Sequence, residues 1–162
     1  MPKFREAKPN TESVDDYLKA IFYLSQGSQA RIGSGDLAEQ MGVAPASVTN
    51  MVQKLAALTP SFVDYERHYG VSLSELGLRR ALEIVRHHRL IETFLFQVLE
   101  YPVEALHDEA ERLEHFISED FERRVAMKLG DPERDPHGHC IPRLDGSWPE
   151  GHGTGCGCAR RE

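Results

Sequence analysis

Apolar side chains recur at helical spacing in three segments of the first third of the chain. The first predicted helix begins near Thr11 and ends at 27–29. A second, shorter helix is capped by Ser34 and ends at Gly42, and Pro45 opens a third, because the first turn of a helix tolerates proline. The inward-facing positions of these helices are Tyr17, Leu18, Ile21, Phe22, Leu24, Leu37, Ala38, Met41, Val48, Val52 and Leu55.

Strand-like patterns replace helical spacing after residue 60. Two short pieces, 61–65 and 71–74, flank a turn that ends at Gly70, and together they predict a β-hairpin. A helix, a helix-turn-helix and a hairpin, in this order, are typical of a winged helix-turn-helix domain. We expect this domain to occupy 1–75.

Helical spacing returns in the remainder of the chain and predicts a mainly α fold. A second, helical domain is expected at 76–145. Proline and glycine dominate after Gly130, and 146–162 is expected to be a flexible glycine-rich tail. The helical segments predicted for the second half are 75–98, 102–118 and 119–129.

The composition is that of a folded, soluble protein, because 40% of the 162 residues are hydrophobic and 28% are charged. No apolar run reaches the roughly 18–20 residues that span a bilayer, and the first residues lack a signal-peptide core. Three cysteines provide no disulfide framework, and Cys156, Cys158 and His152 are too few ligands to predict a metal site in the tail. We therefore expect a cytoplasmic protein.

The net charge of −7 argues against nucleic-acid binding, but it is an average over a chain whose charges are unevenly distributed. Between Gln40 and Val63 the chain has no acid and one lysine, Lys54. The acids concentrate in 104–122, where Arg112 is the only basic residue besides histidine. This separation predicts two parts with different partners.

The second helix of the helix-turn-helix carries uncharged hydrogen-bonding side chains on its outer face. In such a motif this helix enters the major groove, where side chains of modest size reach base edges. Lys54 is placed to meet phosphate, and Arg67, His68 and Tyr69 at the hairpin tip suit a wing that follows the DNA backbone. The alternative is a helix that only packs on its neighbours and shows a polar face to water. The candidate base-reading residues are Ser47, Thr49, Asn50 and Gln53.

The acidic segment 107–117 places four metal-binding side chains on one face. At about 100° per residue, His107, Glu111, Glu114 and His115 share a face about 100° wide. A separate apolar stripe lies beside them, so the face borders the core. Burial of several like charges is costly unless a cation or partner compensates them. The stripe consists of Leu106, Ala110, Leu113 and Ile117.

Two further positions repeat this chemistry. His88 and Glu92 are four residues apart and lie on one helix face, and Asp16 stands beside the apolar stripe of the first helix. Imidazole and carboxylate ligands suit Mn²⁺, Fe²⁺, Co²⁺ or Zn²⁺. The Glu/His motif alone is more typical of a solvated helix face. Three such positions beside core stripes favour a metal site.

The chain resembles the diphtheria-toxin-repressor and manganese-transport-regulator family of bacterial metal-dependent transcription factors. The resemblance runs from about residue 13 to 144 and is carried by DDYLKAIFYL, SVTNMVQKL, RHHRLIETFL, HDEAERLEHFISEDFERRV and DPHGHCIP. It implies a winged helix-turn-helix domain followed by a metal-binding and dimerisation domain. The SH3-like third domain of many relatives does not fit in a chain of this length.

The resemblance also implies two metal sites. The primary site corresponds to Asp16, Glu111, Glu114 and His115, where carboxylates replace the sulfur ligands of the iron-responsive branch. The secondary site corresponds to His88, Glu92 and His107, with His137 as a further ligand and His139 and Cys140 as other candidates. Lys19 stands where the manganese branch with bridged ions has a glutamate, which favours two separate sites.

The function implied is that of a homodimeric repressor that binds a palindromic operator in double-stranded DNA and controls metal-uptake genes. Mn²⁺ is the expected cofactor, Fe²⁺ is the alternative, and Zn²⁺ or Co²⁺ can substitute in vitro. One rival is a metal-dependent hydrolase, against which stands the lack of a nucleophile elbow or a phosphate-binding glycine loop in the sequence. The other is a winged-helix regulator that senses a non-metal signal.

Overall fold

The computed structural model of the chain describes residues 11–152. Three helices open the fold: α1 (Thr11–Leu24), α2 (Ser34–Met41) and α3 (Pro45–Ala56). Ser34 was predicted to cap α2, but it is the first residue of the helix. Gly33, which has no side chain, takes the N-cap position. Pro45 stands in the first turn of α3, as predicted.

An antiparallel hairpin follows, with β1 (Val63–Glu66) paired to β2 (Gly70–Leu73) in the register Val63 to Leu73 and Glu66 to Gly70. Gly70 adopts a φ of +100°, and a Cβ atom at this position would lie 2.5 Å from the carbonyl oxygen of Ile32. Only glycine allows this approach, through which Ile32 and Val71 exchange backbone hydrogen bonds. The hairpin is thereby fixed to the segment between α1 and α2.

The second half contains α4 (Glu75–Gln97), α5 (Val103–Leu113) and α6 (Glu119–Lys128). The hydroxyls of Ser74 and Ser118 cap α4 and α6 by accepting backbone N–H bonds. The helix expected to continue through residue 118 ends earlier, at Leu113. Glu114 takes its C-cap position and a turn continues to Phe116. Leu113 is exposed, so it does not belong to the buried stripe in which it was expected.

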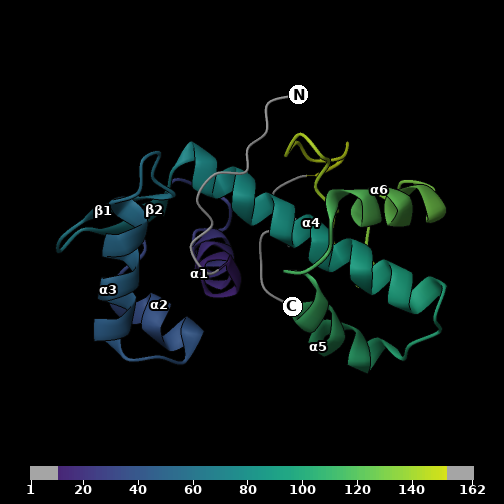
Figure 1. Ribbon diagram of the computed structural model, residues 1–162, viewed down its shortest axis with the longest axis horizontal. Helices are drawn as coiled ribbons and strands as arrows, with labels where there is room; N and C mark the ends of the chain where they lie inside the picture. Colours follow the sequence, from purple (N-terminus) through teal and green to yellow (C-terminus); the bar gives the residue numbers. More distant parts are fainter. Residues whose placement is uncertain (1–10, 153–162) are drawn as a thin grey trace.

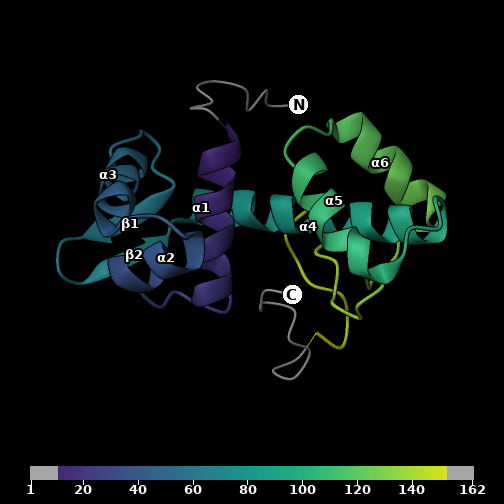
Figure 2. The same cartoon turned by 90° about the horizontal axis from the view of Figure 1, so that it is seen from below.

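The long helix α4 passes through both halves of the molecule (Figures 1 and 2). Its first half supplies Ala81, Leu82 and Val85 to the large core formed by α1, α2, α3 and the hairpin. Its second half supplies Leu90 to a core with α6 and Ile91 and Leu95 to a core with α5. A single rigid element therefore connects the two halves. The described residues contain no helix long and apolar enough to cross a membrane.

The segment after α6 returns along α4 toward the first half. Arg134 and Cys140 form a β-bridge at its start, and Ile141 is buried against Leu90. Further along, the Trp148 ring stacks on Phe22 of α1, with 6.4 Å between ring centroids. The predicted tail at 146–162 thus begins with residues that contact the first domain. Residues 153–162, including Cys156 and Cys158, lie outside the described residues.

Candidate metal centre and nucleic-acid interface

The eight residues predicted as metal ligands come from five parts of the fold and form one connected network. α1 supplies one, α4 two, α5 two, the turn after α5 two and the loop after α6 one. In this network each residue has an atom within 3.8 Å of an atom of another. The residues are Asp16, His88, Glu92, His107, Glu111, Glu114, His115 and His137.

The first group joins α1 to the turn after α5. The Nε2 atom of His115 lies 3.1 Å from Oδ1 of Asp16 and 3.4 Å from Oε1 of Glu114. Ligand atoms of these three residues all fall within 4.8 Å of one another, a spacing that one metal ion could bridge. Glu114 is wholly buried. Asp16 belongs to the first domain and the other two belong to the second, so this group spans the domain boundary.

The imidazole of His115 is oriented from behind by Asp15, which the sequence analysis did not single out. The Asp15 carboxylate lies 3.4 Å from Nδ1 of His115 and accepts two hydrogen bonds of 2.7 Å from Arg80. Burial lowers the pKa of His115, but hydrogen bonds to Asp15 and Asp16 outweigh it and raise this pKa to about 10. A metal ion bound at Nε2 would therefore displace a proton.

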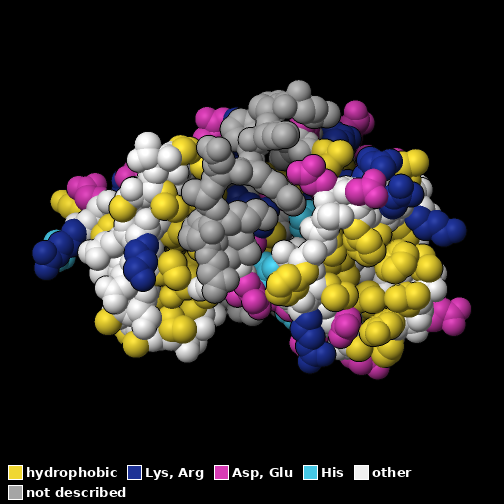
Figure 3. Space-filling view, viewed as in Figure 1, with side chains coloured by type: hydrophobic (Ala, Val, Ile, Leu, Met, Phe, Trp, Pro, Cys, Tyr) yellow, Lys and Arg dark blue, Asp and Glu magenta, His cyan; other side chains and the backbone are white. Residues whose placement is uncertain are grey.

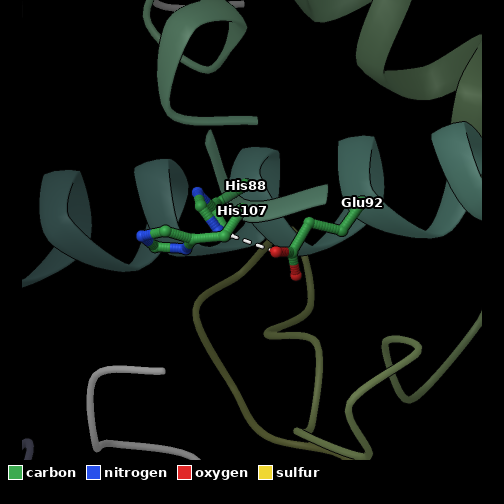
Figure 4. A group of neighbouring side chains, drawn as sticks. All are labelled: His88, Glu92 and His107. Atoms are coloured by element: carbon green, nitrogen blue, oxygen red, sulfur yellow. Dashed lines mark ion pairs between the residues drawn. The ribbon is translucent and has the colours of Figure 1, made fainter. Parts of the chain in front are cut away.

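The second group consists of His88 and Glu92 on α4 and His107 on α5 (Figure 4). The Nε2 atom of His88 lies 3.2 Å from Oε1 of Glu92, and the rings of His88 and His107 are 5.0 Å apart. Both residues on α4 are buried. Burial lowers the pKa of His88, but hydrogen bonds to Glu114 and Glu92 raise it to about 9.

Glu111 was predicted to join Asp16, Glu114 and His115 in the first group. In the structure it lies between the first and second groups. Its ligand atoms group with those of His88 and Glu114, and its Oε1 lies 3.8 Å from Nε2 of His107. A lysine stands between the carboxylates: Nζ of Lys19 donates to Glu111 at 2.6 Å and to Glu114 at 2.5 Å. The predicted primary and secondary ligands are therefore continuous in space.

The loop after α6 adds a third group, formed by Asp135, His137 and His139. The Nδ1 atom of His137 lies 3.4 Å from Oε2 of Glu92, which connects the loop to the second group. Asp135 accepts backbone N–H bonds of 2.9 Å from both histidines and so fixes the loop. Cys140, the other candidate, is buried in the core and belongs to none of the ligand groups found among the described residues.

Asp15 and Asp135 are the residues of this region that sequence reasoning missed as participants, whereas Lys19 was singled out there but its contacts with Glu111 and Glu114 were not predicted. Asp135 carried a signal, since it stands two residues before a candidate histidine in DPHGH, where an aspartate often accepts backbone N–H bonds. Asp15 offered only its position next to Asp16. Its contact with Arg80 joins residues 65 apart in the sequence, which no local pattern reveals.

The donor chemistry of the three groups fits a divalent transition metal. Every ligand atom in them is a carboxylate oxygen or an imidazole nitrogen, the set that suits Mn²⁺, Fe²⁺, Co²⁺ and Zn²⁺. Burial of carboxylates such as Glu92 and Glu114 is costly unless nearby cations compensate their charge. Metal binding here would supply positive charge to a carboxylate-rich space between the domains.

The predicted base-reading residues lie on the outer face of α3. Ser47, Asn50, Gln53 and Lys54 are exposed. Thr49 is half-buried and its hydroxyl donates to the carbonyl of Pro45 at 3.1 Å, so it presents mainly its methyl group. The face is polar and free of acids, as a surface that approaches DNA requires.

The predicted wing tip projects from the hairpin. Arg67, His68 and Tyr69 form the three-residue loop between the strands and are all exposed. His68 has a φ of 71°, which closes the loop tightly. Arg31 holds the base of the wing through a 2.7 Å ion pair with Asp64. The wing and α3 therefore belong to one folded unit.

Two family models match the chain. "Iron dependent repressor, N-terminal DNA binding domain" matches residues 10–71, and "Iron dependent repressor, metal binding and dimerisation domain" matches residues 74–143. The boundary between them falls at the start of α4.

Curated relatives agree with these models. An uncharacterised HTH-type transcriptional regulator of Methanocaldococcus jannaschii is 32% identical, over 72% of this chain and 92% of the relative. The iron-dependent repressor IdeR of Mycobacterium tuberculosis is 32% identical over 82% of this chain, which spans 56% of that repressor. The HTH-type transcriptional regulator MntR of Bacillus pumilus is 35% identical over 67% of this chain and 72% of its own length.

Solved structures show the same architecture. A manganese-dependent transcriptional repressor in complex with manganese superposes with a TM-score of 0.74 and 43% identity, over 84% of this chain and 61% of that chain. ScaR with bound Zn²⁺ gives a TM-score of 0.74 and 36% identity, over 86% of this chain and 64% of its own. On the two matched domains, the relatives and this common fold, the chain belongs to the iron-dependent repressor family, which includes the diphtheria-toxin-repressor and manganese-transport regulators.

Proposed function

We propose that this chain is a homodimeric repressor that binds double-stranded DNA when a divalent metal ion occupies the network between its domains, and that it controls genes of metal uptake. One observation carries the proposal: Asp16 on α1 lies within 3.1 Å of His115, which follows α5. A ligand set shared by the DNA-binding half and the other half can convert metal binding into a fixed orientation of the two.

The coupling follows from charge. Without a bound ion, Lys19 offsets only part of the repulsion among Asp16, Glu111 and Glu114 across the domain boundary, because one positive charge faces three negative ones, and separation of the domains relieves the remainder. A divalent ion shared by these carboxylates would compensate more of their charge and hold the domains together. If this arrangement is the one that binds DNA, DNA must tighten metal binding by the same factor, because the coupling between two binding sites is reciprocal. The added positive charge also reduces the net charge of −7 that opposes phosphate.

Mn²⁺ is the metal that we propose first. The ligand groups contain five glutamate and aspartate residues besides histidines and no sulfur, and harder ligands favour harder ions. Fe²⁺ is the alternative, and Zn²⁺ or Co²⁺ can substitute in vitro. The names of the relatives include both an iron-dependent and a manganese-dependent repressor, and ScaR has been solved with Zn²⁺ and with Cd²⁺.

A homodimer on a palindromic operator is the form that we propose for the active protein. Hydrophobic side chains gather on the half of the molecule that contains α5, α6 and the end of α4 (Figure 3). Exposed apolar surface of this extent is typical of a protein interface. Two α3 helices would then enter successive major grooves about one DNA turn apart. The exposed large hydrophobic residues of these helices and their connecting turns are Phe96, Val98, Leu99, Val103, Leu113, Phe116, Phe121 and Met127.

The test is DNA binding with and without metal. Fluorescence anisotropy of a labelled operator duplex, titrated with the full chain, should show tight binding in Mn²⁺ and weak binding in chelator. Glu114→Gln should abolish this difference because the amide cannot replace a buried carboxylate ligand. Asp108→Asn, which removes an exposed acid from α5, is the matched control and should respond to Mn²⁺ normally. Equal affinity of the unmodified chain in Mn²⁺ and in chelator would refute the proposal.

A further inference from the structure

Lys19 is a buried cation at the point where the predicted ligand groups meet. It lies three residues after Asp16 on α1, hence on the same helix face, and only 9% of its side chain is exposed. Its Nζ atom donates to Oε1 of Glu111 at 2.6 Å and to Oε1 of Glu114 at 2.5 Å. The lysine therefore crosses from the first domain to the second.

The two oxygens that Lys19 contacts also approach other predicted ligands. Oε1 of Glu114 lies 3.4 Å from Nε2 of His115, while the second oxygen of the same carboxylate, Oε2, lies 2.5 Å from Nδ1 of His88. Oε1 of Glu111 is likewise the atom that faces His88 and His107, at 3.8 Å from each. The ammonium group therefore binds the carboxylates on the side where an ion shared with the histidines would have to bind.

We infer that Lys19 is an intramolecular competitor of the metal ion, whose ammonium group must leave Glu111 and Glu114 before both can bind a divalent cation. This inference rests on the proposed function and names a residue that sets the metal concentration at which the protein would respond. An ammonium group and a divalent ion on the same oxygens repel each other strongly, because the space between the domains is poorly solvated. Lys19 thereby weakens metal binding and raises the metal concentration at which the protein responds.

The same contact stabilises the metal-free protein. The ammonium group of Lys19 lies between the carboxylates of Glu111 and Glu114 and donates a hydrogen bond to each. It offsets the repulsion between the two carboxylates while no metal is bound. Removal of the charge of Lys19 should therefore have two opposite effects. It should strengthen metal binding, and it should destabilise the metal-free chain.

The experiment compares the full chain with Lys19→Met, which keeps the length of the side chain and removes its charge. In isothermal titration with Mn²⁺, Lys19→Met should bind about tenfold more tightly or better, since a like charge has been removed beside the ion. Its thermal midpoint should be lower than that of the unmodified chain in chelator and should rise more on addition of Mn²⁺. Lys128→Met, which removes an exposed lysine from α6, is the control and should match the unmodified chain in both measurements.

Lys19→Gln provides the second variant if Lys19→Met does not fold without metal. Its amide is also neutral but still donates hydrogen bonds to the carboxylates, and it should bind Mn²⁺ more tightly as well. Unchanged or weaker Mn²⁺ binding by the folded neutral variants, with normal binding by the unmodified chain, would overturn this inference and leave the proposed function intact. An unmodified chain and variants that all fail to bind Mn²⁺ would refute both.

Discussion

Asp15 and His115 are in contact across the domain boundary, with 3.4 Å between Oδ2 and Nδ1, although they are 100 residues apart in the sequence. The contact leaves Nε2 of His115 facing Asp16 and Glu114. A carboxylate behind a ligating imidazole fixes the orientation of the ring and increases its basicity. The two adjacent aspartates of α1 therefore differ in role. Asp16 faces the candidate metal site directly, whereas Asp15 orients His115, one of the predicted ligands.

Asp15→Asn is expected to weaken Mn²⁺ binding by about tenfold to a hundredfold, the usual effect of removing such a supporting carboxylate. The reason is that the neutral amide no longer orients the imidazole of His115. Isothermal titration provides the measurement. The control is Asp64→Asn, which removes from the wing the carboxylate that pairs with Arg31. This variant should leave the Mn²⁺ affinity unchanged. If Asp15→Asn binds Mn²⁺ as tightly as the unmodified chain, Asp15 has no positioning role.

Asn50 and Lys54 on α3 should give different signatures in DNA binding. Asn50→Ala is expected to cost about 1–3 kcal/mol on the operator and little on unrelated DNA, because we propose that its exposed amide reads a base edge. Lys54→Ala should weaken binding to both and reduce the salt dependence by about one unit per chain, because its proposed partner is a phosphate. Anisotropy titrations at several salt concentrations measure both effects. An unchanged ratio of specific to non-specific affinity in Asn50→Ala would exclude Asn50 from base contacts.

Leu99 provides a test of the proposed dimer. It is 51% exposed in the turn between α4 and α5, among the apolar residues of the second half. Leu99→Glu should dissociate the dimer or weaken it severely, because a charge buried in an interface without a partner is costly. Leu144→Glu is the control, since Leu144 is 75% exposed but lies outside the helices of that half. Sedimentation velocity should report a monomer for the first variant and a dimer for the second; two dimers would place the interface elsewhere.

Glu122 is expected to stabilise the docking of α6 on α4 in a pH-dependent way. Its carboxylate binds Arg86 at 2.5 Å and lies 3.2 Å from His87. Burial raises the pKa of Glu122, but hydrogen bonds from His87 and Arg86 outweigh it, so this pKa lies below 4.5. The stabilisation is therefore complete above pH 4.5 and is lost as the pH falls through the lowered value.

Glu122→Gln should accordingly lower the free energy of unfolding by about 2 kcal/mol at neutral pH. The difference from the unmodified chain should shrink as the pH is lowered below 4.5, the ordinary pKa of glutamate. Urea denaturation at pH 7 and in acid measures both. Glu119→Gln, at an exposed position of the same helix, is the control and should have little effect at either pH. A difference that stays constant with pH would show that the charge of Glu122 does not contribute.

Sequence periodicity suffices for much of this fold because the helices are amphipathic and their spacing reports which face is buried. The order of α1, α2, α3 and the hairpin, and the start of α4 after Ser74, follow from apolar spacing and from turn residues. The pairing of His88 with Glu92 is also predictable, since residues four apart on a helix are neighbours. The ligands within one helix could therefore be identified locally.

Contacts between elements could not be predicted in this way. A helical projection of 107–117 placed Glu111 with His115, whereas α5 ends at Leu113 and the turn beyond it directs His115 toward α1. The sequence contains no strong stop signal after Leu113, so the earlier end of the helix is a tertiary effect. Lys19 is another example, because its contacts with Glu111 and Glu114 depend on how α1 packs beside α5.

The shared helix α4 has a mechanical consequence for any dimer built on the second half. Its 23 residues span about 35 Å, and the hairpin that precedes it carries the reading helix α3 at the far end. A tilt of this helix by about 5° about its C-terminal end would move its N-terminal end by about 3 Å. A displacement of about 3 Å is larger than the range of distances over which a hydrogen bond to a base can form. In the proposed dimer, small adjustments among the side chains around His88 would therefore be magnified at the DNA, and the spacing of the two long helices would matter for recognition as much as the residues of α3.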